Sequence, residues 1–219
     1  MVDRGIAAWC GILSGIGLTA EAALFMGSGW SVDAFATLDG AAGAMAEGGH
    51  QLRWAVVFGV FNLALLTVFL AGLAEYLGSS SQSLRSAILH VGLVGIAIHA
   101  IVPIGFYQAV PALQLLAEDP AGETIWTSWK FILDATQGAG IFFMGLSMLA
   151  AGIGWMNRRT TRSPFLAALA LLAGSAGVAA VLGQATSLDP IVGLVGMAGL
   201  LLSILFRVLG GIHMLRFGT

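Results

Sequence analysis

Charge is the scarcest property of this sequence. Only 9% of its 219 residues are Asp, Glu, Lys or Arg, whereas hydrophobic residues make up 58%. A water-soluble domain of this size carries far more charge on its surface, so the composition excludes that class of protein. The formal net charge is −2 and no basic patch is present, so we expect no nucleic-acid partner.

Cysteine and catalytic motifs are also scarce. Cys10 is the single cysteine, which excludes an internal disulfide and any CxxC metal or redox motif. HExxH, GxSxG, a P-loop and a dinucleotide-binding GxGxxG in a strand–helix context are all lacking. There is no arginine ladder and no selectivity-filter sequence. We therefore expect no catalytic residue and no metal ligand set, and the balance favours a protein that is not an enzyme. Whether the protein binds a cofactor is left open by the sequence.

Long apolar runs are what the sequence does have. Each of six runs is long enough to cross about 30 Å of hydrocarbon. They cover approximately residues 5–27, 53–77, 85–111, 126–156, 164–184 and 190–214. The first run continues through Phe25 and Met26, which favours an uncleaved membrane helix over a signal peptide. The prediction is an all-α polytopic membrane protein, a single six-helix transmembrane bundle over residues 1–219.

Basic residues predict the orientation of this bundle. With a cytoplasmic N-terminus, the inner side holds Arg4, Arg85, Arg158, Arg159, Arg162, Arg207 and Arg216, and the outer side Arg53 and Lys130. The outer loops hold the acidic residues Asp33, Asp39, Glu47, Glu118, Asp119, Glu123 and Asp189. An excess of Lys and Arg marks the cytoplasmic side, so we expect both termini inside. The predicted location is the inner (plasma) membrane of a bacterial-type cell, with the lipid bilayer as the first partner.

The segments between the spans carry two further expectations. All six tryptophans, at positions 9, 30, 54, 126, 129 and 155, fall near predicted span ends, as in an interfacial aromatic belt. Residues 28–52 are expected to form a glycine-rich outer loop with a short surface helix. The inner connections 78–84 and 157–163 are short, so the helices that each one joins should be antiparallel neighbours.

Several polar residues interrupt the apolar spans. A carboxylate in a membrane helix costs about 2.5–3.5 kcal/mol, so each one needs a partner or a function. Glu21 continues a stripe of small residues on the first span and should point into the bundle. Lys130, Asp134 and Gln137 share one face of the fourth span. Lys130 and Asp134 can pair at i, i+4; if Lys130 instead reaches outward, Asp134 needs His99 or a proton.

The second and third spans add an amide and two histidines. Asn62 is expected either to make an interhelical hydrogen bond or to line a site. Pro103 has no amide hydrogen, so the carbonyl of His99 loses its helical partner and polarity gathers there. His90 lies on the opposite helical face from His99, so the two cannot bind one metal from the same side.

Near the inner boundary, two more residues have expected roles. Glu75 should face Arg207 or Arg85 in an anchoring pair. Arg207 itself is expected near the inner edge of the last span, where its side chain can reach lipid headgroups.

The depth of these residues suggests a function. The ligand- or proton-binding candidates lie in the outer part of four different spans: Glu21, Asn62, His99, Lys130, Asp134 and Gln137. If they converge, they form an outward-facing polar pocket that binds or conducts a small ligand or protons. The alternative is a structural or accessory subunit of a larger membrane complex, holding lipids or pigments, with a homo-oligomer or partner membrane subunits around it. A third reading is an intramembrane enzyme that uses Glu21, His99 and Asp134.

Three segments carry a resemblance to a known family. They are GILSGIG at 11–17, RRTTRSPF at 158–165 and FRVLGGIHMLR at 206–216. In these segments and in its general layout the chain resembles an uncharacterised family of bacterial six-helix integral membrane proteins, a domain of unknown function. The resemblance implies a six-helix membrane fold over most of the chain and transfers no activity or residue role.

Overall fold

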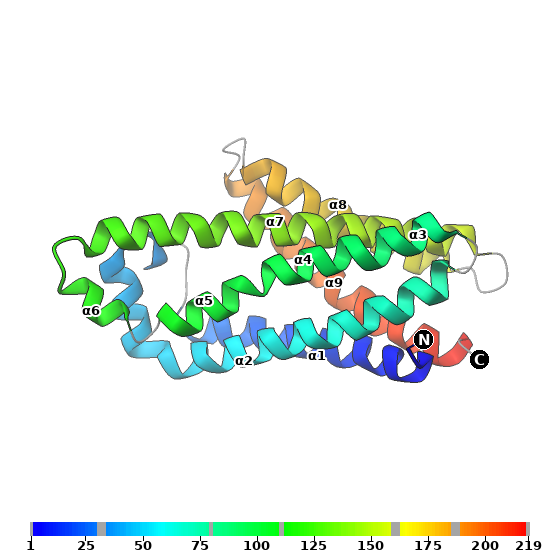
Figure 1. Ribbon diagram of the computed structural model, residues 1–219, viewed down its shortest axis with the longest axis horizontal. Coiled ribbons are helices and arrows are strands. Elements are labelled where there is room, and N and C mark those ends of the chain that lie inside the picture. The colour runs from blue at the N-terminus through cyan, green and yellow to red at the C-terminus, as the bar shows by residue number, and fades with distance from the viewer. Residues whose placement is uncertain are drawn as a thin grey trace.

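The computed structural model describes residues 2–29, 34–78, 81–109, 112–158, 163–184 and 189–217. Long helices run side by side along the molecule, and the two chain ends lie at the same end of it (Figure 1). No strand occurs in these described ranges. Six of the helices in them are long and apolar enough to cross a membrane. The all-α prediction, with six helices long and apolar enough to span a membrane, is confirmed at this level.

The elements in chain order are α1 (Arg4–Gly27), η1 (a 3-10 turn, Ala34–Ala36), α2 (Leu38–Leu77), α3 (Gln82–Ser86), η3 (a π-helical segment, Ala87–Val91), α4 (Gly92–His99), α5 (Ile101–Ala109), α6 (Leu113–Ala117), α7 (Gly122–Asn157), α8 (Pro164–Gln184) and α9 (Asp189–Phe217). Helix α1 packs between α2 and α9, and α8 packs between α7 and α9. The third span, from α3 to α5, lies against both α2 and α7. The predicted neighbours along the chain, second with third span and fourth with fifth, are therefore in contact.

Small residues allow α1 to approach its neighbours closely. A Cβ placed on Gly72 of α2 would lie 2.2 Å from the Cβ of Ala7. One placed on Gly211 of α9 would lie 2.5 Å from the carbonyl oxygen of Ala8. Close backbone approach replaces the hydrophobic effect as the source of helix association in lipid, because lipid tails are as apolar as the side chains.

Helices α2 and α7 are longer than a membrane requires. They contain 40 and 36 residues, which at about 1.5 Å per residue is nearly twice the thickness of the hydrocarbon layer. Their extra turns lie at the end opposite the chain termini, which we call the distal end, together with η1 and α6 (Figure 1). There they enclose a separate distal core of Phe35, Leu38, Ala41, Met45, Leu52, Leu113 and Trp126.

The distal core corrects the expectation for residues 28–52. Of these, residues 38–52 are not a loop, because α2 begins at Leu38 rather than at residue 53. Thr37 caps the helix by accepting a hydrogen bond from the Gly40 amide at 3.2 Å, and Glu123 of α7 accepts one from the Leu38 amide at 3.1 Å. One of the glycines that suggested a loop serves packing instead: a Cβ on Gly48 would lie 2.1 Å from the carbonyl oxygen of Ser28.

The tryptophan belt is only partly present. Trp9 and Trp54 are 57% and 49% exposed, as an interfacial position allows. Trp126 is 1% exposed within the distal core, and Trp155 is fully buried beside Tyr76. These two rings therefore pack against other helices instead of lying on the surface of the bundle. Trp30 lies outside the described residues.

The third span is irregular in two places. Its α-helix stops at His99 and resumes at Ile101. Pro103, four residues after His99, has no amide hydrogen to donate to the His99 carbonyl oxygen. This interruption was predicted. The π-helical segment η3 was not predicted; the Ser147 hydroxyl of α7 donates to the carbonyl oxygen of Ile88 within it, at 2.6 Å.

Candidate functional site

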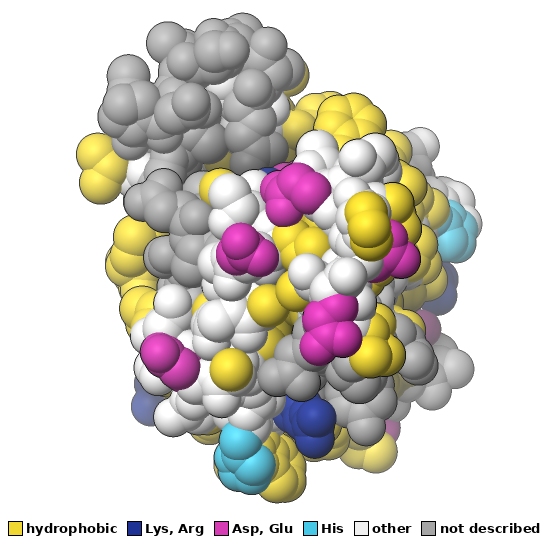
Figure 2. Space-filling model, turned by 90° about the vertical axis from the view of Figure 1, so that its left-hand side faces the viewer, with side chains coloured by type: hydrophobic (Ala, Val, Ile, Leu, Met, Phe, Trp, Pro, Cys, Tyr) yellow, Lys and Arg dark blue, Asp and Glu magenta, His cyan; other side chains and the backbone are white. Residues whose placement is uncertain are grey.

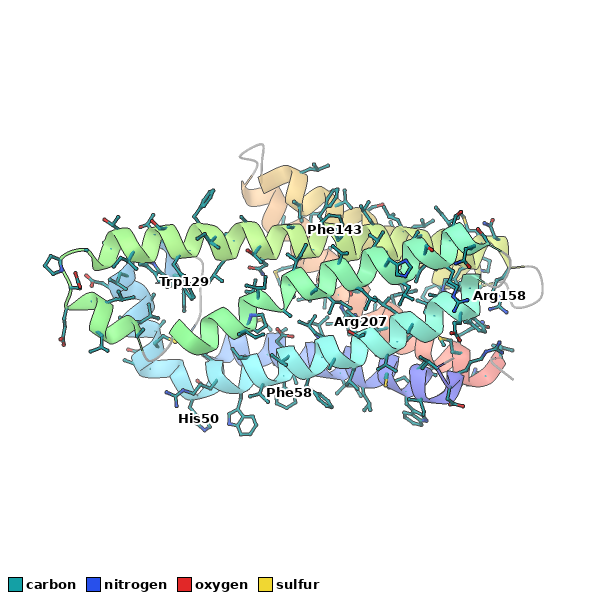
Figure 3. All side chains as sticks on the ribbon, in the orientation of Figure 1. His50, Phe58, Trp129, Phe143, Arg158 and Arg207 are labelled. Carbon is teal, nitrogen blue, oxygen red and sulfur yellow. The ribbon has the colours of Figure 1, made fainter. Side chains whose placement is uncertain are left out.

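Arg207 lies near the middle of the last span rather than at its edge. The apolar span of α9 runs from Leu194 to Phe217, and Arg207 is only 5% exposed. Its side chain points among the helices in the centre of the molecule (Figure 3). The expectation that it reaches lipid headgroups is therefore wrong, because its helical face packs on α1 instead of facing the inner boundary.

Arg207 holds together a network of hydrogen bonds from three helices. Its Nη1 donates to the Asn62 Oδ1 of α2 at 2.8 Å and to the Ser14 Oγ of α1 at 3.1 Å. The Ser14 hydroxyl donates to the same Asn62 Oδ1 at 2.7 Å. Asn62 Nδ2 in turn donates to the Glu21 Oε2 of α1 at 3.3 Å. We call Ser14, Glu21, Asn62 and Arg207 the central network.

Glycines make room for these side chains. A Cβ on Gly59 of α2 would lie 2.7 Å from Glu21 Oε1, so the carboxylate rests directly against the backbone of α2. A Cβ on Gly17 would lie 3.5 Å from the Cβ of Asn62. The prediction that Glu21 points into the bundle along a small-residue face is confirmed by these contacts.

The charge of Arg207 is only indirectly neutralised. Its two hydrogen-bond acceptors, Ser14 and Asn62, are neutral, and Asn62 stands between it and the carboxylate of Glu21. A buried charge is stable only when it is paired and hydrogen-bonded. Within the described part of the chain, no acceptor bonds the buried Nε of Arg207, so one of its donors stays unused.

His99 brings a fourth helix to the same region. Its backbone packs on Gly140 of α7, where an added Cβ would lie 2.7 Å from the His99 Cβ. The Nδ1 of His99 is also buried, and no hydrogen-bond partner for it exists among the residues that the structure describes. His90, by contrast, is exposed, which agrees with its predicted position on the opposite face.

The three polar residues of α7 take a different position. Lys130 Nζ and Asp134 Oδ2 are 2.5 Å apart, and their side chains are 32% and 58% exposed. Gln137 is exposed as well. Of the two predicted arrangements, the structure shows the pair within the helix, and Asp134 does not turn to His99. The six predicted candidates thus divide: Glu21 and Asn62 are hydrogen-bonded to each other, His99 packs on Gly140 of α7, and Lys130, Asp134 and Gln137 stay on the outer surface of α7.

Arg207 and Ser14 are the members of the central network that were not among the predicted site residues. The position of Arg207 in the middle of an apolar run, with Ser203 and Gly210 on the same face, was a usable signal. Its expected partner Glu75 instead pairs with Arg85 at 3.2 Å, the other predicted choice.

A second cluster lies near the chain termini and is mainly aromatic. Trp155 and His213 have ring centroids 4.7 Å apart, and Tyr76 packs on both. The Arg158 guanidinium carbon lies 3.8 Å from the Tyr76 ring centroid and its side chain donates to the Tyr76 carbonyl oxygen. These contacts join α2, α7 and α9, so this cluster is explained by packing and cation–π attraction.

Neither a metal site nor a similarity to a known protein points to a further functional residue. Within the described residues, no group of three or more His, Cys, Asp or Glu side chains could hold a metal ion. Comparisons with protein-family models, with curated proteins and with solved structures give no match. The functional argument therefore depends on the geometry of the central network and His99.

Proposed function

We propose that this protein binds a small polar solute within its membrane-spanning bundle, at the central network, as a transport protein does. The observation that carries the proposal is Arg207, a guanidinium buried near the middle of a span whose Nε has no acceptor among the described residues. Ionisable groups inside a membrane bundle are costly and mark solute or ion pathways. Transporters likewise bind their solutes near the bilayer midplane.

The orientation belongs to the same proposal. We place the termini in the cytoplasm of a bacterial-type cell and the distal end outside, in the inner membrane. Supporting this, acidic side chains are spread over the distal end (Figure 2), and Arg4, Arg85 and Arg158 belong to segments at the other end. Arg207 no longer counts toward the inner basic residues, since it is buried. Glu21 follows Ser14 toward the distal end and is only partly buried, so we propose that the solute enters from that side.

An accessory subunit is the competing function. In such a protein the polar residues would serve only to hold helices together, and a purely structural network would be expected to satisfy its own donors. The Nε of Arg207, which no acceptor in the described part of the chain bonds, favours binding over that alternative.

A thermal-shift experiment tests the proposal. Purified protein in mild detergent is heated with a panel of small anionic, cationic and neutral solutes, alongside Arg207→Lys and Lys130→Gln. We expect at least one solute to raise the melting temperature of the wild type. Arg207→Lys keeps the charge but loses the planar fork of donors, so it should weaken that stabilisation by about tenfold in concentration or more.

Lys130→Gln is the matched control, because Lys130 is a cation in a membrane helix outside the central network. It should respond to the solute as the wild type does. If Arg207→Lys does not fold, Ser14→Ala replaces it, since this change removes one of the two acceptors of Nη1. Equal stabilisation of wild type and network variants, or no stabilising solute in the panel, would refute the proposal.

A further inference from the structure

An open groove lies between the start of α8 and the end of α9, and none of the described residues that line it belongs to the central network. Both helix ends lie at the end of the molecule that holds the chain termini (Figure 1). The groove has a volume of about 180 Å³. It therefore lies where two apolar spans reach their boundary. The apolar part of its wall consists of Phe165, Leu166, Leu209, Ile212 and Phe217.

Arg216 gives this groove a positive charge. The described residues that line it include no Asp or Glu. Arg216 is exposed, and no residue in the described ranges forms an ion pair or a hydrogen bond with its side chain. By contrast, Arg85 pairs with Glu75 at 3.2 Å, and Arg158 packs on the ring of Tyr76. The guanidinium of Arg216 is thus available to an anion from outside the chain.

Ser163 places a hydroxyl in the same groove. Its Oγ accepts a hydrogen bond from the Leu166 amide at 3.3 Å, at the start of α8. A hydroxyl can donate one hydrogen bond while it accepts another. The groove therefore offers an anion a second, uncharged donor beside the guanidinium.

An apolar stripe on α9 continues from Arg216 toward the middle of the span. Leu201 and Leu205 are 59% and 49% exposed. From Leu201 to Arg216 the helix rises about 22 Å, more than half of the roughly 30 Å of hydrocarbon in a bilayer. The stripe is thus long enough for an acyl chain that reaches the middle of the bilayer. Its members follow one another at steps of three or four residues and so share one helical face: Leu201, Leu205, Leu209, Ile212 and Arg216.

We propose that this groove holds an anionic phospholipid, whose headgroup phosphate accepts hydrogen bonds from Arg216 and one of whose acyl chains lies along the apolar stripe. Charge complementarity selects the headgroup, because a guanidinium binds phosphate through paired hydrogen bonds and basic pockets between spans recognise anionic headgroups. A second copy of the chain fits less well, since a two-fold contact at this groove would bring two Arg216 side chains together. The inference depends on the six membrane spans and not on the central network.

Native mass spectrometry of the purified full chain in mild detergent tests the proposal. The probes are phosphatidylglycerol, phosphatidylcholine with the same acyl chains, and glycerol phosphate, which is a headgroup without chains. We expect phosphatidylglycerol to bind about tenfold more tightly than phosphatidylcholine, and glycerol phosphate not to bind at concentrations that saturate phosphatidylglycerol. Equal affinities for the two lipids overturn the inference. Binding of glycerol phosphate as tight as that of phosphatidylglycerol does so too, because the groove then takes a free phosphate.

Variants locate the lipid. Arg216→Gln should remove the preference for phosphatidylglycerol, whereas Arg53→Gln, at an exposed arginine of α2, should keep it. Ile212→Trp fills the groove and should weaken both lipids by about tenfold, whereas Ile153→Trp, at an exposed isoleucine of α7, should not. A preference that persists in Arg216→Gln, or unchanged lipid binding to Ile212→Trp, contradicts the proposal. Should Ile212→Trp not fold, Arg216→Glu replaces it and should make phosphatidylglycerol the weaker ligand.

Arg207→Lys separates this inference from the proposed function. Arg207 is buried and does not line the groove, so Arg207→Lys should bind phosphatidylglycerol as the wild type does. If a solute stabilises the wild type through Arg207 but the two lipids bind equally, only the lipid inference falls. If no solute in the thermal-shift panel depends on Arg207 while the lipid preference depends on Arg216, only the proposed function falls.

Discussion

The central network and the Lys130–Asp134 pair both place charges in apolar helices, but their partners come from different places. Lys130 and Asp134 belong to one helix and meet at i, i+4 on its exposed face. Arg207 meets Ser14 and Asn62 across two helix interfaces and is almost fully buried. The first arrangement exists whenever α7 is helical, whereas the second exists only when α1, α2 and α9 have packed together.

This difference predicts which contacts matter for stability. A contact within one helix survives the separation of the bundle, so its loss changes the folded and unfolded states in similar ways. A contact between helices is lost on unfolding, and removing one partner leaves the other buried without compensation. Four substitutions test this distinction, and two of them have a matched control variant.

The largest effect is expected for Asn62→Leu. It removes the acceptor that Arg207 and Ser14 share and the donor to Glu21, leaving a buried guanidinium with one remaining acceptor. The free energy of unfolding, measured by denaturant titration in detergent, should fall by about 3 kcal/mol. A loss below about 0.5 kcal/mol would mean that the network contributes no more than an exposed pair.

The second-largest effect is expected for Gly48→Ala, which is compared with a substitution at the adjacent glycine of α2, Gly49. In Gly48→Ala the new methyl group would meet the carbonyl oxygen of Ser28, whereas none of the described residues places an atom within 4 Å of a carbon added at Gly49. Gly48→Ala should lower the free energy of unfolding by roughly 1–3 kcal/mol through overpacking.

Its neighbour is the control. Gly49→Ala should raise the free energy of unfolding by about 0.5–1 kcal/mol, because alanine favours the helix over glycine. Equal effects of the two substitutions would show that residues 38–52 do not pack against the end of α1.

A smaller effect is expected for Ser147→Ala. The hydroxyl of Ser147 crosses from α7 to the carbonyl oxygen of Ile88 in the π-helical segment. Its removal should cost about 1 kcal/mol in the same denaturant titration. Thr136→Val is the control, since the Thr136 hydroxyl bonds the Ile132 carbonyl within α7. Equal losses in the free energy of unfolding for Ser147→Ala and Thr136→Val would contradict the distinction between contacts across helices and contacts within one helix.

The smallest effect is expected for Lys130→Gln. Its partner Asp134 is on the same helix and more than half exposed. The free energy of unfolding should change by less than about 0.5 kcal/mol. A loss comparable with that of Asn62→Leu would mean that the pair holds α7 to another helix or to a second molecule.

Features that depend on composition and on local spacing could be predicted from the sequence. Length and apolarity of the runs identify six membrane spans, since hydrocarbon thickness sets how many residues a helix needs. The interruption after His99 follows from the missing amide of Pro103, and the Lys130–Asp134 pair from helical periodicity. The small-residue face of α1 likewise indicated that Glu21 points inward.

Only the tertiary structure decided which polar residues meet. The burial of Arg207, the choice of Arg85 as the partner of Glu75 and the continuation of α2 to Leu38 depend on how separate helices pack. Hydropathy places a residue along the membrane normal and periodicity assigns it a helical face, but neither says which other helix that face contacts. An arginine near a span end was therefore assigned to the headgroups, while its partners lay far away in sequence at Ser14 and Asn62.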